Sequence, residues 1–351
     1  MTTTPTVRGA LLVGSINLPD AGTAIGAAAA VLGTRLKRIP DGEPGVRWHW
    51  LTFQGDILAA GDGLERVGDQ PVLLRSVDLR PVRLTGSADD VRLPSLGYAA
   101  AAIESYGAFT ALRDAGVVPA GVRFEVALPT PAAVTAVFVV PADRAAFEPV
   151  YEAALARELD EILAAIPHDD LAIQWDTAVE FMFLEAGGYD GPFAETAQHW
   201  FDDVWTAVID RAVRQAALVP ADVEVGFHLC YGDAGEEHFV QPTDTANLVR
   251  FANELTARAP RALTWVHLPV PIERDDAAYY APLADLRLQD STELYLGLVH
   301  REDGVEGARR RIAAAAPFVA EFGVGTECGI GRAPAGTAID ILETHRVAST
   351  W

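Results

Sequence analysis

The sequence predicts an α/β fold, a single (β/α)8 TIM barrel in which each parallel strand is followed by a helix. Short β-branched or apolar runs alternate along the chain with long alanine-rich amphipathic segments, which is the pattern of repeated βα units. The length of 351 residues suits one barrel with a few insertions. Half of the residues are hydrophobic, so one large core can be filled.

Eight short runs are expected to form the barrel strands, because each is apolar and ends at a turn or a polar residue. They cover residues 10–13, 35–39, 122–127, 171–175, 223–227, 263–266, 293–299 and 322–324. Repetition of these units around one axis predicts a single domain over residues 1–351. The segment 61–94 fits no βα unit, and we interpret it as an insertion or an extra hairpin.

Three segments between the strands are the clearest helices. The first is expected over residues 143–166, where apolar residues lie close to one stripe at helical spacing. The second follows Thr243, where Thr-Asp-Thr supplies candidate N-caps, and the third covers 306–320. All three suit the outer layer of a barrel.

The charge of the chain excludes several classes of partner. Asp and Glu total 49 against 27 Lys and Arg, which gives a formal net charge of −22. Such a chain repels both a nucleic-acid backbone and an anionic membrane surface, and no apolar run reaches the ~18 residues of a spanning helix. The opening MTTTPTVRG lacks the basic and apolar regions of a secretory signal. We therefore expect a cytoplasmic enzyme acting on small molecules, with no nucleic-acid or membrane partner.

Polar residues follow nearly every predicted strand. In a barrel, reactive groups gather where strands end and βα loops begin, because this rim combines rigid support with access to substrate. The candidate residues at the strand ends are Ser15, Glu43, Asp176, His228, Cys230, His267, His300, Glu302 and Cys328.

A zinc site is predicted from the two cysteines of the chain. In His228-x-Cys230 both side chains lie on one side of an extended backbone, since strand residues two apart face alike. Cys328 adds a second thiolate from another strand end of the same rim. Imidazole with thiolates is a zinc combination, and three protein ligands leave a fourth position for substrate.

Simpler interpretations of these residues stay open. A buried Cys beside a buried His also occurs in ordinary cores, and a disulfide is disfavoured only by a reducing compartment. His267 is a further ligand, a general acid near the ion, or a histidine satisfied at the rim. Glu327 can replace Cys328 as a ligand, although strand alternation points it away. Glu43 can cap a turn while Asp176 pairs with an arginine such as Arg47.

Five segments, read in order, resemble the C-terminal catalytic barrel of the cobalamin-independent methionine synthase family. LLVGSINLPD is similar to the family's Ile-Gly-Ser-Phe-Pro opening, DGEPGVRW to its His-Gly-Glu segment and AIQWD to its Ile-Gln-Ile-Asp-Glu-Pro strand. HLCYGD is similar to its His-x-Cys-Tyr segment, and ECGIGR to its Asp-Cys-Gly-Leu-x-x-Arg segment. The resemblance runs from Leu11 to Arg332 and implies a barrel of the methionine synthase/uroporphyrinogen decarboxylase-like superfamily.

The resemblance implies a role for each matching residue. Ser15, Glu43 and Asp176 would hold the amino acid part of a homocysteine-like thiol. Zn²⁺ on the histidine and two cysteines named above would bind the thiol sulfur. The partners implied are a small-molecule thiol and an alkyl donor.

The chain departs from the family mainly on the donor side. The family's N-terminal barrel, which helps to bind folate, is absent, so we expect that methyl-tetrahydrofolate is not the donor. The third family ligand, a glutamate, has no counterpart in TWVHLPVP, where His267 is nearest. The family's Asp-x-His-Ser reads VHRED here, which leaves His300 or Glu302 as the acid. Asp176-Thr177-Ala178 replaces Asp-Glu-Pro and lacks one carboxylate.

The function expected is therefore a zinc-dependent transfer of a methyl or other alkyl group onto a thiol. An epoxide-opening thiol transferase or carbon–sulfur lyase of the coenzyme M transferase type is the alternative, although a sulfonate-bearing thiol favours arginines over Glu43 and Asp176. A metal-free decarboxylase-like barrel would need basic residues for several substrate carboxylates. A zinc store would need four fixed ligands.

Overall fold

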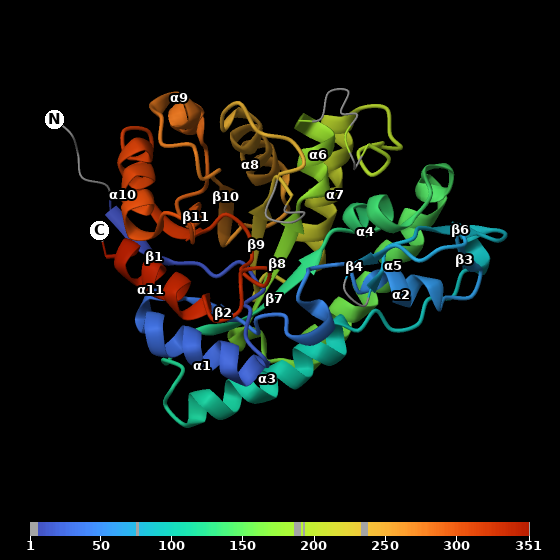
Figure 1. Ribbon diagram of the computed structural model, residues 1–351, viewed down its shortest axis with the longest axis horizontal. Helices are drawn as coiled ribbons and strands as arrows, with labels where there is room; N and C mark the ends of the chain where they lie inside the picture. Colours follow the sequence, from blue (N-terminus) through green and yellow to red (C-terminus); the bar gives the residue numbers. More distant parts are fainter. Residues whose placement is uncertain (1–5, 75–76, 186–190, 192–193, 233–237, 351) are drawn as a thin grey trace.

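A curled sheet of eight parallel strands, surrounded by helices, forms the centre of the computed structural model (Figure 1). The structure describes residues 6–74, 77–185, 191, 194–232 and 238–350. The strand order is β1-β12-β11-β10-β9-β8-β7-β2, so each strand between the two edges β1 and β2 lies beside the sheet strands that adjoin it in sequence. This order is the one that successive right-handed βα units produce.

Each strand of the sheet overlaps one of the eight predicted strands. They are β1 (Thr6–Ala10), β2 (Arg38–Pro40), β7 (Arg123–Pro129), β8 (Leu171–Thr177), β9 (Glu224–Leu229), β10 (Trp265–Pro269), β11 (Glu293–Val299) and β12 (Glu321–Thr326). β1 shares only Ala10 with its predicted range of 10–13, and β10 extends from its predicted range of 263–266 to Pro269. Leu11 to Val13 are buried like a strand, but the last ladder pair between β1 and β12 joins Ala10 to Val324.

The two edges of the sheet meet without a continuous ladder in the described residues. Isolated parallel bridges join Ala10 to Leu36 and Ser15 to Gly42. At Gly9, with φ of 81°, a Cβ would lie 2.5 Å from the carbonyl oxygen of Arg35, so glycine permits this close approach. The structure thus shows a barrel-like curled sheet, a coarser result than the closed barrel that the sequence predicts.

Eleven helices occur in the described residues and largely cover the outside of the sheet (Figure 1). They are α1 (Ala21–Leu32), α2 (Gln54–Ala59), α3 (Tyr98–Asp114), α4 (Pro131–Phe138), α5 (Arg144–Ala165), α6 (Val179–Glu185), α7 (Val204–Leu218), α8 (Ala246–Arg258), α9 (Ala277–Tyr280), α10 (Gly304–Ala315) and α11 (Ala338–Ala348). The three helices predicted from the sequence are confirmed as α5, α8 and α10. At α8 the capping oxygen is that of Asp244, which accepts from the Ala246 amide at 2.8 Å. In the part of the chain described, none of these helices has the length and hydropathy needed to cross a membrane.

The segment 61–94 forms two small antiparallel sheets, apart from residues 75 and 76, which lie outside the described residues. β3 (Leu64–Arg66) pairs with β6 (Val82–Leu84), and β4 (Leu73–Leu74) pairs with β5 (Val77–Asp78). A bridge from Val82 to Val139 attaches this segment to the end of α4. The segment therefore adds hairpin strands to the barrel-like sheet beside α2 and α4.

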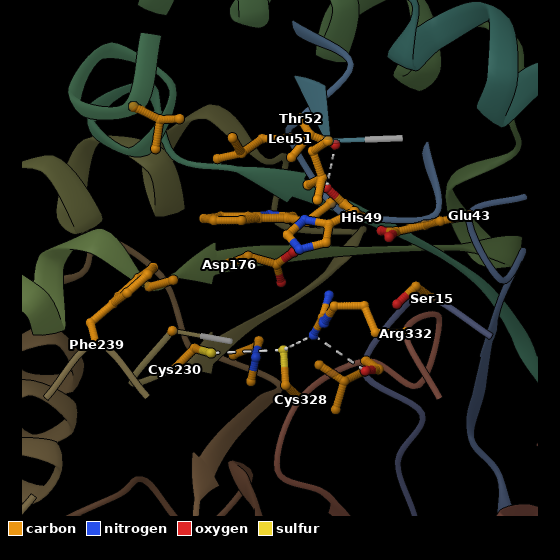
Figure 2. A pocket seen from close by; sticks show the side chains of 18 of the residues that line it. Ser15, Glu43, His49, Leu51, Thr52, Asp176, Cys230, Phe239, Cys328 and Arg332 are labelled. Carbon is orange, nitrogen blue, oxygen red and sulfur yellow. Dashed lines mark hydrogen bonds between the residues drawn. The ribbon is translucent and has the colours of Figure 1, made fainter. Parts of the chain in front are cut away.

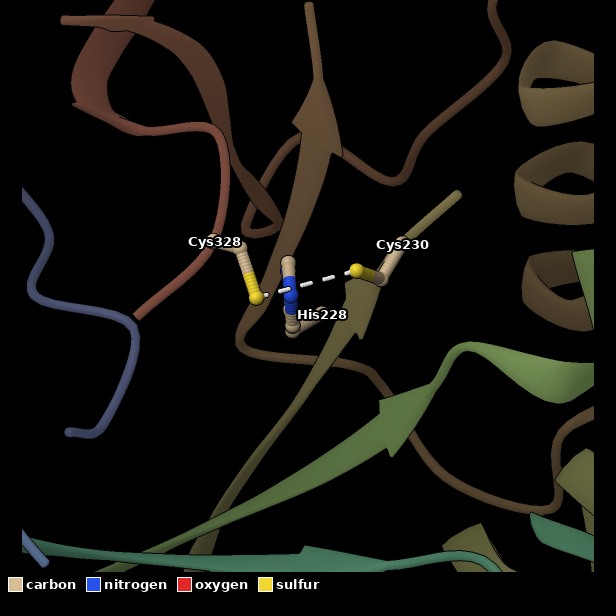
Figure 3. A group of neighbouring side chains, drawn as sticks. All are labelled: His228, Cys230 and Cys328. Carbon is tan, nitrogen blue, oxygen red and sulfur yellow. Dashed lines mark hydrogen bonds between the residues drawn. The ribbon is translucent and has the colours of Figure 1, made fainter. Parts of the chain in front are cut away.

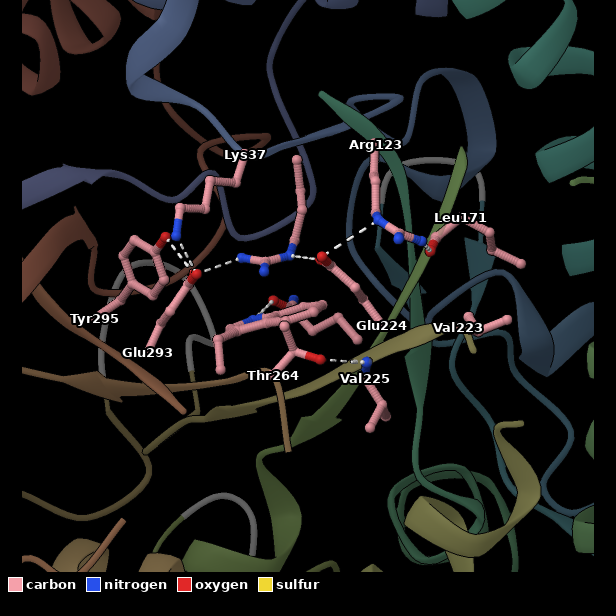
Figure 4. Close-up of polar contacts among 12 residues, drawn as sticks. Lys37, Arg123, Leu171, Val223, Glu224, Val225, Thr264, Glu293 and Tyr295 are labelled. Atoms are coloured by element: carbon pink, nitrogen blue, oxygen red, sulfur yellow. Dashed lines mark hydrogen bonds and ion pairs between the residues drawn. The ribbon is translucent and has the colours of Figure 1, made fainter. Parts of the chain in front are cut away.

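Paired charges fill the amino end of the sheet (Figure 4). The buried Arg38 guanidinium lies 4.1 Å from the ring centre of Trp265. Its Nε lies 2.5 Å from Glu224 and its Nη1 lies 3.0 Å from Glu293. Arg38, Glu224 and Glu293 each begin a strand, and a buried charge requires such partners. This end is packed, so the open cavity must lie elsewhere.

Candidate metal and substrate site

A cavity of about 460 Å³ opens at the carboxyl ends of the strands (Figure 2). Two loops, after β1 and β2, contribute Ser15 and Glu43, while β8 contributes Asp176. The end of β9 and the loop after β12 complete the wall with His228, Cys230 and Cys328. The structure thus brings together all three expected substrate residues and three of the expected metal ligands.

The histidine and the two cysteines form one compact group (Figure 3). The possible ligand atoms of His228, Cys230 and Cys328 all lie within 4.8 Å of one another, and the two Sγ atoms are 3.8 Å apart. Within the described part of the chain, Nε2 of His228 is buried and has no hydrogen-bond partner. Burial holds the pKa of His228 well below its usual range, so the ring is neutral, as a metal ligand must be. A soft donor set with an unsatisfied imidazole nitrogen fits zinc.

Backbone contacts hold the two cysteines in place. The Cys230 amide donates to the Thr177 carbonyl at 3.0 Å, which extends the contact between β9 and β8 by one residue. After β12, the Ile330 amide donates to the Ser15 carbonyl at 2.8 Å. A Cβ on Gly329 would lie 2.3 Å from the Ser15 hydroxyl oxygen, so glycine lets the Cys328 loop pack against the Ser15 loop. Both thiols are therefore supported by elements on opposite sides of the cavity.

His267 lies behind His228 rather than beside the sulfur atoms. Nδ1 of His267 is 2.8 Å from Nδ1 of His228, so one ring donates and the other accepts. Burial lowers the pKa of His267 to about 3, and its ring is neutral. His267 is not among the side chains whose ligand atoms cluster, and its position suits the orientation of His228.

Replacing His267 by leucine is expected to weaken zinc binding by ~10- to 100-fold while all three ligands remain. The physical reason is that the His228 ring loses the partner that fixes its tautomer and direction. Competition with a chromogenic chelator measures this affinity. His345→Leu is the matched control, because His345 is also buried and its Nδ1 contacts the Ile341 carbonyl rather than a candidate ligand. Equal zinc affinities for both variants would assign His267 a packing role only.

Both carboxyl groups of the cavity, Glu43 and Asp176, have raised pKa values. Burial first, and then the charge of Glu43, raises the pKa of Asp176 well above its usual range. Oδ1 of Asp176 accepts a hydrogen bond of 2.9 Å from the side-chain Nε2 of Gln174. Burial also raises the pKa of Glu43 to about 7. Glu43 has a φ of 50°, a conformation that non-glycine residues rarely adopt and that often occurs at functional sites.

The alternative partner of Asp176 is excluded. Arg47 pairs instead with Asp41, with Nη2 to Oδ2 at 2.5 Å. Asp41 also accepts from the Glu43 amide at 2.8 Å, so it is Asp41 that completes the turn. In the described residues no ion pair engages Glu43 or Asp176. The cavity therefore offers two carboxyl groups to a cationic ligand.

Arg332 was not assigned a role from the sequence, although it ends the ECGIGR segment. Its Nη2 donates to Sγ of Cys328 at 3.3 Å and reaches the Gly329 carbonyl at 3.5 Å. A guanidinium at this distance favours the thiolate form of Cys328. The signal for this residue was its position four places after the cysteine, on a loop that turns back toward the cavity.

A second cavity of about 700 Å³ adjoins the first at Cys328, Gly329 and Arg332, and is lined by His300 and Glu302. Nε2 of His300 contacts the Val270 carbonyl at 2.8 Å, and burial lowers its pKa, so the ring is neutral at pH 7. Glu302 pairs with the neighbouring Arg301 at 2.5 Å. The structure does not bring these two residues into the cavity of the sulfur group, and their acid role stays a prediction.

Glu327 also contacts this second cavity. Its Oε1 lies 2.7 Å from Nε2 of His238. The carboxylate is therefore engaged outside the group formed by His228 and the two cysteines, as the alternation of strand residues indicated.

The fold and the cavity place this chain among proteins with the architecture of methionine synthase-like barrels. It is similar to a B12-independent methionine synthase from Shewanella sp. W3-18-1, solved in complex with selenomethionine, with a TM-score of 0.56 and 15% identity. A protein described as a vitamin-B12-independent methionine synthase from Listeria monocytogenes gives 0.53 and 18%, and a methyltransferase from Methanosarcina mazei gives 0.52 and 11%. No known family profile and no curated protein matches the sequence. The resemblance found in the sequence is thus confirmed at the level of the fold.

These alignments also bear on the length of the chain. They cover 100%, 98% and 99% of this chain, and 97%, 96% and 94% of the other chains, in the same order. The solved chains therefore leave little length for a second barrel.

Proposed function

We propose that residues 1–351 form a single-domain cytoplasmic enzyme that transfers a methyl or other alkyl group onto the thiol of a homocysteine-like amino acid with the help of zinc. One observation carries the proposal: a cavity is lined both by a soft group of two thiols and an imidazole and by two carboxyl groups that form no ion pair with another described residue. The fold shared with methionine synthases and a methyltransferase supports methyl transfer.

His228, Cys230 and Cys328 would hold the zinc ion, with a fourth position left to the substrate. A free thiol has a pKa of about 8.5 and is mostly protonated at neutral pH. Zinc bound there supplies the charge that keeps a substrate thiol deprotonated while it remains nucleophilic.

The other residues of the cavity bind and orient the thiol. Glu43 and Asp176 attract its ammonium group, which in turn favours their charged forms. The Ser15 hydroxyl accepts from the Gly331 amide at 3.1 Å, so its proton is left to donate to the substrate carboxylate. Arg332 stabilises the Cys328 thiolate from outside the group.

The alternative functions fit the charges of the cavity less well. A sulfonate-bearing thiol or a polycarboxylate for decarboxylation requires basic side chains. Among the described residues that line the site cavity, Arg332 is the one lysine or arginine, and it is engaged with Cys328. A storage protein would not need two carboxyl groups beside the metal.

Two measurements test the proposal together. Protein purified without chelators should contain about one zinc per chain and form a thioether from homocysteine with a suitable alkyl donor. We expect methyl-tetrahydrofolate not to serve as that donor. Folate-dependent methionine formation at ~1 s⁻¹ or faster would contradict this part of the proposal.

The affinity for homocysteine is expected to rise between about pH 6 and pH 8. The raised pKa of Glu43, about 7, means that its carboxyl is protonated at the lower end and gains its charge over this interval. Only the charged form attracts an ammonium group. Titration calorimetry at several pH values measures the effect.

Thiol ionisation also varies over this range, so a reference ligand is needed. 4-Mercaptobutanoate lacks the ammonium group and reports the thiol contribution alone. The difference between the two thiols should rise with pH in the parent chain and rise less steeply over this interval in Glu43→Gln, where Asp176, with its raised pKa, still gains its charge. A difference that stays constant in the parent chain would show that Glu43 does not bind the ammonium group.

A further inference from the structure

One wall of the site cavity is apolar and comes from segments that the proposed thiol site does not use. The side chains on it are Trp50, Leu51, Leu74, Leu79, Val137 and Phe239. They lie on the loop after β2, on β4 and just after β5, on α4 and on the chain after β9. The added strands of segment 61–94 therefore form part of the wall of the site cavity.

Figure 2 shows Glu43, Ser15 and Arg332 on one side of the view, Phe239 on the opposite side and Asp176 between them, with the sulfur atoms of Cys230 and Cys328 below. An acceptor held by Glu43 and a donor against the apolar wall would both reach the sulfur group. The geometry is that of two adjoining subsites.

Among the described residues, no lysine or arginine lies on the apolar side of the cavity. The chain has a single lysine, Lys37, and this residue pairs with Glu293 at the amino end of the sheet. Arg332, the one lysine or arginine among the described lining residues, contacts Cys328. A carboxylate buried here would lose its hydration without gaining a partner, and it would be repelled by Glu43 and Asp176.

Trp50 is the tryptophan of this wall. Its backbone φ of 49° is rarely adopted by a large residue, which indicates that the surrounding structure holds it in place. Its Nε1 is buried and is not exposed to the cavity. Trp50 therefore contributes apolar ring surface to the wall rather than a hydrogen-bond donor.

We propose that this apolar wall binds the leaving group of the alkyl donor, and that the leaving group is an uncharged aromatic ring. The inference rests on the proposed alkyl transfer and names its donor class. The acceptor sulfur attacks the alkyl carbon, a sulfur–carbon bond forms, and the bond from that carbon to the leaving group breaks. The leaving group keeps the electron pair and takes up the proton that the thiol has lost, so no further reactant is needed.

A matched pair of probes tests the charge preference. Thioanisole and 4-(methylthio)benzoate share a methylthio-substituted ring and differ by one carboxylate. We expect thioanisole to bind at least tenfold more tightly in titration calorimetry, both with and without zinc. Equal binding, tighter binding of the carboxylate, or no binding of either probe would overturn the proposal.

Variants on the added strands locate the probe. Leu74→Arg should reverse the preference, because it places a cation on the wall, while Leu73→Arg should leave it unchanged, because Leu73 is 64% exposed and does not line the cavity. Leu79→Arg provides a second test if Leu74→Arg fails to fold. An unchanged preference in a folded Leu74→Arg or Leu79→Arg variant would overturn the assignment. A chain that binds thioanisole but no zinc would refute the proposed function, and with it the role of the wall in alkyl transfer, while showing that the wall binds an uncharged aromatic ring.

Discussion

Cys230→Ser and Cys328→Ser are each expected to purify with little zinc and to lose thiol alkylation by on the order of 1000-fold or more. The two sulfur atoms lie 3.8 Å apart in the same group as His228, so either substitution leaves one thiolate and one imidazole. A serine hydroxyl preserves the shape of the side chain but is a poor ligand for zinc. Metal analysis of the purified variants and single-turnover kinetics measure the two losses.

The effects of the two substitutions on activity should not be additive. Once one thiolate is gone the ion is absent, so the double variant is expected to be no worse than either single variant. His168→Asn is the control, since His168 pairs with Asp222 near the surface and should keep its zinc and its activity. Retention of about one zinc in both cysteine variants would show that the ion binds elsewhere.

Asp176→Asn is expected to weaken homocysteine binding by ~30-fold or more, and Glu43→Gln by a smaller factor, because Asp176 is the more deeply buried carboxyl. Each substitution removes a carboxyl group that becomes charged when the ammonium group binds. Binding of 4-mercaptobutanoate should change little, because this thiol has no ammonium group. Calorimetry on zinc-loaded protein compares the two ligands.

Glu125→Gln is the matched control for both variants. Glu125 is buried, and burial raises its pKa to about 8, yet it does not line the site cavity. Its substitution should leave both thiols bound as in the parent chain. An equal loss of both thiols in Asp176→Asn would mean that the substitution disturbs the sulfur group rather than an ammonium site.

The sheet was predictable from the sequence because its strands are buried on both faces and appear as short apolar runs. The prediction was less accurate where the apolar run did not coincide with the strand or where the strand was very short. At β1 the run Leu11 to Val13 is apolar, but it lies beyond the last pair of the ladder with β12. The strands of segment 61–94 span two or three residues each, which is too short for an alternating pattern.

The candidate site was predictable to the extent that strand ends determine it. His228 and Cys230 share a face because strand residues alternate, and Cys328 joins them because all strands end at one rim. Ring direction is not determined in this way, so the position of His267 behind His228 required the structure. The contact of Arg332 with Cys328 and the apolar wall depend on loop conformation, which sequence spacing does not specify.

X-ray absorption at the zinc edge, recorded with and without homocysteine, tests the central claim most directly. We expect two sulfur neighbours at ~2.3 Å and one imidazole in the free protein, and three sulfur neighbours when the thiol is bound. Asp176→Asn should require more homocysteine for the same change. A sulfur count that stays at two under saturating homocysteine, or a zinc ion with no sulfur neighbours, would contradict the proposed role of His228, Cys230 and Cys328.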